Sequence, residues 1–201
     1  AISKYLNNHI MNEIKVMNHA ADNIRILAAA AVEKAKSGHP GGAMGGADFI
    51  NVLYSEYLNY DPQNPEWVGR DRFYLDPAQL ALIGKYSLEE LAQLRQWGSP
   101  TTGHPEFEVA RGVENTSGPL GQGHTFAVGA AIAAKFLAAH TGNPTFAKET
   151  IYAYISDGGI QEEISQGAAR IAAVLGLDNL IMFYDSNDIQ LSTETGEVMN
   201  E

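Results

Sequence analysis

The spacing of apolar residues in the first part of the chain predicts two helices separated by a glycine-rich break. From Ile14 onward, apolar side chains recur every three or four positions until Gly38 and Pro40 interrupt the pattern, as is typical of a helix. Five glycines fall within residues 38–46, and this segment is predicted to be a bend. A second helical pattern covers residues 48–57 and ends before a proline-rich turn.

The pattern then changes to a strand, a capped helix and a long loop. Residues 72–75 form a short apolar run that is typical of a buried strand. A helix is predicted over residues 87–97, because Ser87 is suited to the N-cap position and Glu90 follows three residues later, as in a capping box. Residues 99–123 are rich in Gly, Pro, Ser and Thr. This segment is longer than a loop that merely connects two elements of a compact domain, so we predict a binding loop.

The second half of the chain predicts a strand–helix–strand unit. Alanines at helical spacing over residues 127–138 give a helix with a small-residue face that can pack closely on a sheet. Two nearly continuous apolar runs, residues 151–155 and 179–184, are separated by a helix with one apolar face over residues 164–175. Such runs are expected of parallel strands covered on both faces. The fold class predicted is therefore α/β, a parallel sheet flanked by helices.

Composition and charge exclude several classes of protein. The chain has 201 residues, which suits one domain, and no apolar run of membrane-spanning length or of signal-peptide type. It has no cysteine, so disulfides and thiolate metal sites are excluded and a reducing, cytoplasmic location is expected. The net charge of -11 disfavours nucleic acid and acidic membranes as partners. An anionic ligand would need a local cation or a row of backbone N–H groups.

Two polar loops follow the two predicted strands of this unit. Ligands bind outside the carboxyl ends of parallel strands, and both loops, residues 156–159 and 185–189, begin there. Asp157 and Asn187 are therefore expected to direct oxygen atoms at one hard cation, with a backbone carbonyl near Ile189 as a further ligand. Magnesium (or calcium) prefers such oxygen ligands, and diphosphate oxygens and water would complete its coordination.

Gly158 supports the same interpretation, because a residue without a side chain allows the backbone to approach a phosphate closely. The alternative is a plain strand-to-helix turn in which Asp157 is the N-cap of the next helix. The Asp-Gly pair alone does not decide between these two interpretations.

Motifs along the chain resemble one enzyme family. Asp157-Gly158, followed thirty positions later by an Asn-containing turn, resembles the metal and diphosphate motif of thiamine diphosphate enzymes, with Ser156 in place of the usual first Gly. Three further stretches are similar to transketolases in combination: KSGHPGG at residues 36–42, TTGHPE at residues 101–106 and TSGPLGQG at residues 116–123.

The resemblance implies a thiamine diphosphate-binding fold, specifically its diphosphate-binding domain, and roles for several loop residues. His39 and His104 would contact sugar hydroxyls and phosphate or assist proton transfer, and an imidazole in a Gly-His-Pro loop is chemically able to do so. Gly118, Pro119 and Leu120 would approach the aminopyrimidine of the cofactor through backbone groups. Taken singly, however, a His in such a loop is a solvated turn residue more often than a functional one.

Other polar residues have competing interpretations. Glu162 matches a family position at the subunit interface and the cofactor site, but a Glu at a helix N-terminus is also favourable by itself. His124 is predicted to begin the alanine-rich helix, and Glu114 and Asn115 are interpreted as polar loop residues only.

The chain departs from the family pattern in two places, and these departures shape what we expect of it. Where the family has a Gly-His loop after the strand at residues 72–75, residues 76–79 here lead almost directly into residues 80–82. The chain also ends soon after Asn187. We therefore expect an N-terminal extension, residues 1–12, and a diphosphate-binding domain, residues 13–201, that is incomplete at its C-terminus.

The functional expectation is that of half an enzyme. The resemblance implies transfer of a two-carbon ketol unit between sugar phosphates, with the pyrimidine-binding domain supplied by another chain or within a homodimer. The isolated chain is expected to be inactive, because in the family a Glu from the absent domain activates the cofactor. The alternatives are a non-catalytic remnant or assembly module, and a fragment of another thiamine diphosphate enzyme, such as a 2-oxoacid dehydrogenase or a deoxyxylulose phosphate synthase.

Overall fold

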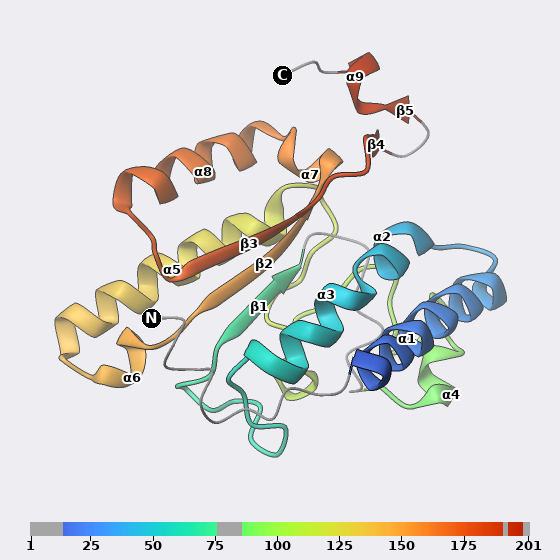
Figure 1. Ribbon diagram of the computed structural model, residues 1–201, viewed down its shortest axis with the longest axis horizontal. Helices are drawn as coiled ribbons and strands as arrows, with labels where there is room; N and C mark the ends of the chain where they lie inside the picture. Colours follow the sequence, from blue (N-terminus) through green and yellow to red (C-terminus); the bar gives the residue numbers. More distant parts are fainter. Residues whose placement is uncertain (1–13, 76–85, 191–192, 199–201) are drawn as a thin grey trace.

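The computed structural model describes residues 14–75, 86–190 and 193–198, and within them the chain forms an α/β domain with three layers. A parallel sheet in the order β1-β2-β3 separates helices α1 to α3 on one side from α5 and α8 on the other (Figure 1). The predicted α/β class is confirmed. The proposed N-terminal extension and the departure from the family pattern after residue 75 lie outside the described residues.

The first layer is helical, as predicted, but its glycine-rich segment is not a simple bend. Helix α1 covers Ile14–Ala35 and buries small alanines against its neighbours. The predicted bend contains helix α2, Pro40–Gly45, which the prolyl ring can begin because the first helical position needs no N–H donor. Helix α3, Ala47–Val52, continues as one π-helical turn, Leu53–Tyr57, in agreement with the second predicted helix.

The predicted capped helix is confirmed at its start and is shorter than expected. Strand β1 covers Arg72–Leu75, and α4 covers only Leu88–Leu91. Ser87 and Glu90 form the predicted capping box, each side chain accepting a bond from the other's backbone N–H. After Leu91 the backbone continues in turns, because the N–H groups of Gln93 and Leu94 donate to carbonyls three residues back. The turns end at Arg95, which has φ 61° and whose N–H donates to the Thr101 carbonyl.

The strand–helix–strand unit is confirmed and builds the centre of the sheet. Helix α5, Gln122–Thr141, precedes the short α6, Pro144–Ala147, and strand β2, Ile151–Ser156. Helices α7, Asp157–Ile160, and α8, Glu163–Leu175, then lead to β3, Leu180–Asp185. Strand β2 is parallel to both of its neighbours. Its first residue, Ile151, lies opposite Arg72 of β1 and opposite Leu180 of β3.

Each face of the sheet has its own apolar core. On the α3 side, Ile50 and Leu53 pack with Phe73, Tyr152 and Tyr154. On the α5 side, a second cluster joins the strands to the small-residue face of α5, as the sequence predicts: Tyr74, Ala127, Ala131, Ile151 and Ala153.

Strand β3 contradicts one expectation, since it is apolar but not covered on both faces. It is an edge strand of this sheet, and Ile181, Met182, Phe183 and Tyr184 remain between 38% and 49% exposed. Its hydrophobic sequence is therefore not matched by burial within the described residues. After β3 come β4, Ile189–Gln190, β5, Thr193–Glu194, and α9, Thr195–Val198.

The long loop over residues 99–123 is confirmed as irregular structure, with one turn of 3₁₀-helix at Val109–Arg111. The prediction that Glu114 is only a polar loop residue is wrong. Its carboxylate lies in a buried ion pair with Arg70, with Nε–Oε1 and Nη2–Oε2 distances of 2.8 and 2.9 Å. Asn115 is also buried. Glu114 thus attaches the loop to the segment that precedes β1.

Among the described residues, no helix combines the length and the apolar character needed to cross a membrane.

Candidate functional site

Asp157 lies directly after β2, at the carboxyl edge of the sheet, and its side chain is buried. The N-cap of the following helix α7 is Ser156, whose hydroxyl accepts a hydrogen bond from the Gly159 N–H at 3.3 Å. The interpretation of Asp157 as the N-cap is therefore wrong. Because Ser156 provides the cap, the Asp157 carboxylate is available for other contacts.

Those contacts join the two predicted loops. Oδ2 of Asp157 accepts the backbone N–H of Asn187 at 2.6 Å and that of Asp188 at 2.8 Å. Oδ1 accepts the hydroxyl of Tyr184, at the end of β3. The pKa of this tyrosine is raised by the bond to Asp157 and by burial, so the phenol keeps its proton. The structure thus brings together two segments that lie thirty positions apart.

The donor set suits a hard cation. A carboxylate has about four positions at which it can accept a hydrogen bond. Three donors contact the Asp157 carboxylate, two at Oδ2 and one at Oδ1, so one acceptor position remains on Oδ1. The amide oxygen of Asn187 accepts the N–H of Ile189 at 3.0 Å and retains a second lone pair. Within the part of the chain that the structure describes, no three His, Cys, Asp or Glu residues cluster as metal ligands. A half-shell of oxygens, completed by a ligand's phosphate and water, is consistent with this arrangement.

The loop that contains Gly118, Pro119 and Leu120 connects this edge to a histidine pocket. A Cβ atom on Gly118 would lie 3.8 Å from Cγ of His104, and one on Gly158 would lie 3.4 Å from Cδ1 of Leu120. Pro119, between them, is exposed. The loop therefore extends from His104 to the turn after β2.

Glu162 is the N-cap residue of α8, is exposed, and makes no capping bond through its side chain. It packs against the same loop, because a Cβ on Gly121 would lie 3.0 Å from the Cβ of Glu162. Gly121 has φ 82°, a conformation that favours glycine.

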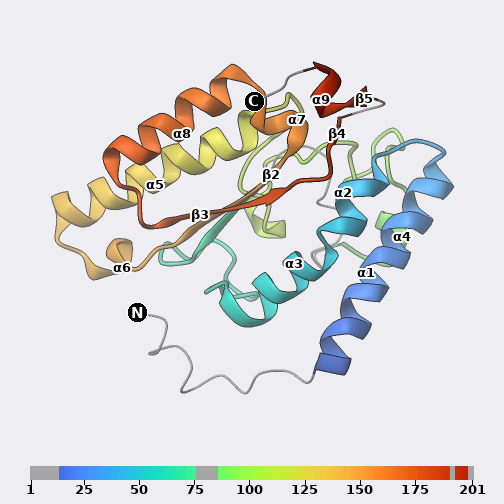
Figure 2. The same cartoon turned by 45° about the horizontal axis from the view of Figure 1, so that its top comes forward.

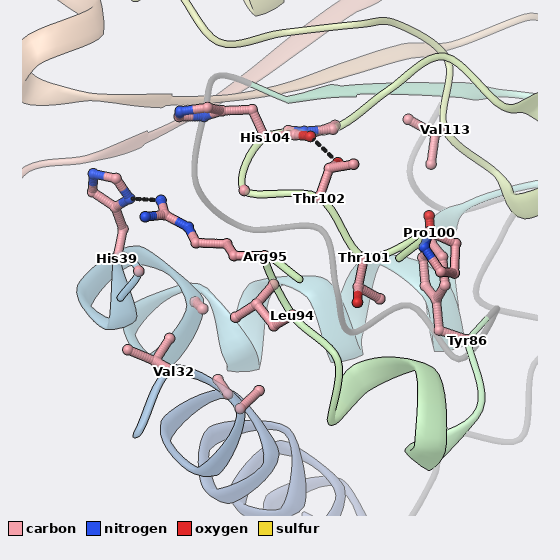
Figure 3. A pocket seen from close by; sticks show the side chains of 16 residues that line it. Val32, His39, Tyr86, Leu94, Arg95, Pro100, Thr101, Thr102, His104 and Val113 are labelled. Carbon is pink, nitrogen blue, oxygen red and sulfur yellow. Dashed lines mark hydrogen bonds between the residues drawn. The ribbon is translucent and has the colours of Figure 1, made fainter. Parts of the chain in front are cut away.

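His39 and His104 face one pocket, with ring centroids 6.0 Å apart (Figure 3). Their loops are separated by about a third of the chain, and α1, α2 and the segment around Thr101 supply the rest of the lining. The cavity holds about 60 Å³. The pKa of His104 is lowered by burial first, and then by His39 and Arg95, so its imidazole is neutral at neutral pH.

The pocket and the Asp157 edge lie near the same end of the sheet, where its strands finish. A Cβ on Gly45, the last residue of α2, would lie 3.7 Å from Oδ2 of Asp185, and Tyr154 donates to the same oxygen at 2.6 Å. Helix α2, which follows His39, is thus held at the carboxyl end of β3. In Figure 2, α2, α7 and β4 meet at this end of the strands. The histidine pocket and the Asp157 edge therefore lie at the same carboxyl end of the strands, and we refer to them as the two ends of the candidate site, the histidine end and the Asp157 end.

Several residues at the site were missed by sequence reasoning. Tyr184 contacts Asp157, and Arg95 contacts His39, but neither belongs to a motif that marks it. One feature of the sequence could have drawn attention to Arg95: it is an isolated arginine that lies shortly before a Gly-His-Pro loop. His124 begins α5 nearly as predicted, but it is fully buried, and burial lowers its pKa to about 4.

Comparison with known proteins gives one consistent result. Residues 16–201 match the family described as "Transketolase, thiamine diphosphate binding domain". A transketolase of Staphylococcus epidermidis is 44% identical over 192 residues, which cover 90% of this chain and 29% of that protein. Transketolase 1 of Pasteurella multocida is 47% identical over 182 residues, covering 85% of this chain and 27% of that protein.

Solved structures agree with these relatives. The transketolase from Campylobacter jejuni superposes with a TM-score of 0.86 at 39% identity, covering 94% of this chain and 31% of that one. The transketolase from Leishmania mexicana superposes with a TM-score of 0.84 at 41% identity, covering 92% of this chain and 29% of that one. The chain therefore spans less than a third of the length of these relatives.

Proposed function

The chain belongs to the transketolase family, in which it matches the thiamine diphosphate binding domain, and we propose that it binds the cofactor's diphosphate through magnesium (or calcium) and contributes to ketol transfer between sugar phosphates. One observation carries the proposal: the buried Asp157 carboxylate is bonded to the backbone of the Asn187 loop at the carboxyl edge of a parallel sheet.

Each site residue has a role in this proposal. Asp157, Asn187 and the carbonyl of Ile189 would hold the metal. Gly158 would let the diphosphate approach the backbone closely, because it has no side chain. The metal is needed electrostatically, since it offsets the repulsion between the diphosphate and a protein of net charge -11.

The histidine end of the site would bind the substrate. His39 and His104 would donate to hydroxyl or phosphate oxygens of the sugar phosphate, or move a proton at those atoms. Gly118, Pro119 and Leu120 would line the cofactor between the two ends through backbone groups. When bound, thiamine diphosphate supplies the carbanion chemistry that ketol transfer requires.

A partner is required for catalysis in this proposal. It is a chain carrying the pyrimidine-binding domain, or a second copy in a homodimer, with Glu162 near the contact. Large exposed apolar side chains support a covered surface on α8, including Ile171, Val174 and Leu175. The alternatives of a remnant or a fragment of another thiamine diphosphate enzyme are not favoured by the similarities found. A cytoplasmic site of action in the pentose phosphate pathway completes the proposal.

Titration calorimetry tests the cofactor proposal. We expect thiamine diphosphate to bind measurably only when magnesium is present, and Asp157→Ala to abolish the heat, because it removes the one anionic metal ligand. Asp178→Ala is the matched control. It removes the same charge from a side chain that is 86% exposed and pairs with Lys135, away from the site. Equal binding with and without magnesium would contradict the proposed site.

A further inference from the structure

Arg95 occupies the histidine pocket in a conformation that requires explanation. Its backbone is left-handed, φ 61°, which is uncommon for a residue with a side chain. The turn is fixed by the N–H of Arg95, which donates to the Thr101 carbonyl at 2.9 Å. A Cβ on Gly103 would lie 2.8 Å from Nε of Arg95, so this glycine leaves room for the side chain. Figure 3 shows the side chain extending along the pocket to the His39 ring.

The guanidinium is held by two polar side chains. Nη1 donates to Oγ of Ser37 at 2.6 Å, and Nη2 lies 3.1 Å from Nδ1 of His39. Among the described residues, no carboxylate pairs with Arg95, whereas Arg25, Arg70, Arg72 and Arg111 all form ion pairs. The contact with His39 is therefore not a by-product of a salt bridge.

This contact favours one tautomer of the His39 ring. A guanidinium has only donors and stays charged in proteins, so Nδ1 of His39 must accept. An imidazole with an acceptor at Nδ1 is neutral and carries its proton on Nε2. The tautomer of a histidine is commonly set in this way by the hydrogen bond at its other nitrogen.

We propose that Arg95 is a positioning residue that favours the His39 tautomer with its proton on Nε2, so that the ring presents a single donor to an oxygen of the bound sugar phosphate. The inference about the substrate rests on the proposed function. The tautomer itself depends only on the contacts of this chain. Because the guanidinium also bonds to Ser37, two residues before His39, Arg95 fixes both the ring and the loop that carries it.

The test measures the tautomer directly in the isolated, ¹⁵N-labelled chain. Two-bond ¹H–¹⁵N spectra distinguish a protonated ring nitrogen from an unprotonated one, and His39→Gln identifies the His39 signals. We expect the Nε2–H form to predominate in the wild type, with a measurable minority of the other tautomer. In Arg95→Met, which keeps much of the side-chain volume but removes every donor, the ratio of the two tautomers should fall roughly tenfold, as expected for loss of a bond to a charged donor.

Two further variants keep the result interpretable. Arg95→Lys retains a charged donor and should recover part of the wild-type ratio. Arg25→Met removes the same charge from an arginine that pairs with Asp22 and Asp48, and it should leave His39 unchanged. A predominantly protonated Nδ1 in the wild type, or an identical tautomer ratio in Arg95→Met, would overturn the proposal. If Arg95→Met fails to fold, the wild-type spectrum and Arg95→Lys still decide.

Activity provides a separate measurement. In enzyme reconstituted with a chain that carries the pyrimidine-binding and C-terminal domains of a related transketolase, Arg95→Met should lower kcat/KM by about tenfold or more, with partial recovery in Arg95→Lys. Wild-type kcat/KM in Arg95→Met would overturn the role toward substrate. Absence of activity in every reconstituted sample, wild type included, would contradict the proposed function, and the spectra would still decide the role of Arg95 toward His39.

Discussion

Asp157 accepts hydrogen bonds from two backbone N–H groups and a tyrosine, so its carboxylate contributes to folding as well as to the proposed metal site. Asn187 differs, because its amide oxygen accepts only the N–H of Ile189 within its own turn, and the side chain is exposed. Two residues proposed to bind one metal therefore have unequal structural roles.

This difference gives a stability prediction. Asp157→Ala should lower the free energy of unfolding by about 1–3 kcal/mol, because it leaves donors without their acceptor, while Asn187→Ala should cost less than about 1 kcal/mol. Urea unfolding monitored by circular dichroism measures both. Equal losses in the two variants would mean that the bonds to Asp157 are not maintained in solution.

His124 makes a second residue-scale prediction, about pH. Burial lowers its pKa in the fold to about 4, whereas an unfolded histidine has a pKa of about 6.5. The folded chain therefore favours the neutral ring. The resulting contribution to stability is complete above about pH 6.5 and is lost as the pH falls toward about 4, by at most about 3 kcal/mol.

Unfolding free energies measured between pH 7 and pH 4 test this prediction. His124→Gln should flatten the decline, because it removes the group that takes up the proton on unfolding. His140→Gln, at an exposed position on the same helix, is the control and should keep the wild-type slope. The same slope in all three proteins would show that His124 does not titrate in this range.

At the scale of elements, the junction between the loop over residues 99–123 and α5 depends on close packing against α8. A Cβ on Gly121 would lie 2.9 Å from Cγ2 of Ile164 and 3.0 Å from Oγ of Ser165. The junction thus allows no side chain, and it fixes the loop that connects the two ends of the site.

Gly121→Ala should therefore destabilise the chain by about 2–4 kcal/mol, from the left-handed backbone and the steric contact together. Gly142→Ala is the matched control at the other end of α5, with φ 66° and no neighbour within 4 Å of the added atom. Gly142→Ala should lower the free energy of unfolding only by the cost of a left-handed backbone at an alanine, about 1–2 kcal/mol. Thermal or urea unfolding gives both values, and equal losses would contradict the packing argument.

At the scale of the whole molecule, the chain corresponds to less than a third of the length of its relatives. We predict that the isolated chain transfers no ketol groups and gains activity when mixed with a chain carrying the pyrimidine-binding and C-terminal domains of a related transketolase. The physical reason is that catalysis needs an acid that activates the cofactor, together with a fixed orientation of the reacting groups.

Proton NMR in deuterated buffer provides a readout that does not depend on turnover. Exchange of the cofactor's reactive ring proton should stay near its rate in free solution with this chain alone, and should accelerate on complementation. The Asp157→Ala chain mixed with the same partner serves as the control without diphosphate binding. Robust turnover by the purified chain alone would refute the half-enzyme interpretation.

The sequence by itself determined the order of the main helices and strands, the α/β class and the family. Apolar periodicity located α1, β1, α5, β2, α8 and β3, because helices and strands repeat their buried positions at different spacings. The Ser87 capping box was readable because its two partners are three residues apart. Where the information is local, the sequence was sufficient.

Only the tertiary structure decided the contacts between distant segments. Sequence predicted that the loops of Asp157 and Asn187 would meet, since parallel strands end at one edge, but not that Ser156 would cap α7 or that Tyr184 would bond to Asp157. Contacts made by a side chain across the fold have no fixed sequence spacing and therefore leave no periodic signal.

The same reason explains the remaining errors. Glu114 pairs with Arg70 across 44 positions, and Arg95 reaches His39 across 56. Strand β3 has the composition of a covered strand, but it lies at the sheet edge. Burial depends on which elements pack against a strand as well as on its own residues, so only the folded arrangement determines it.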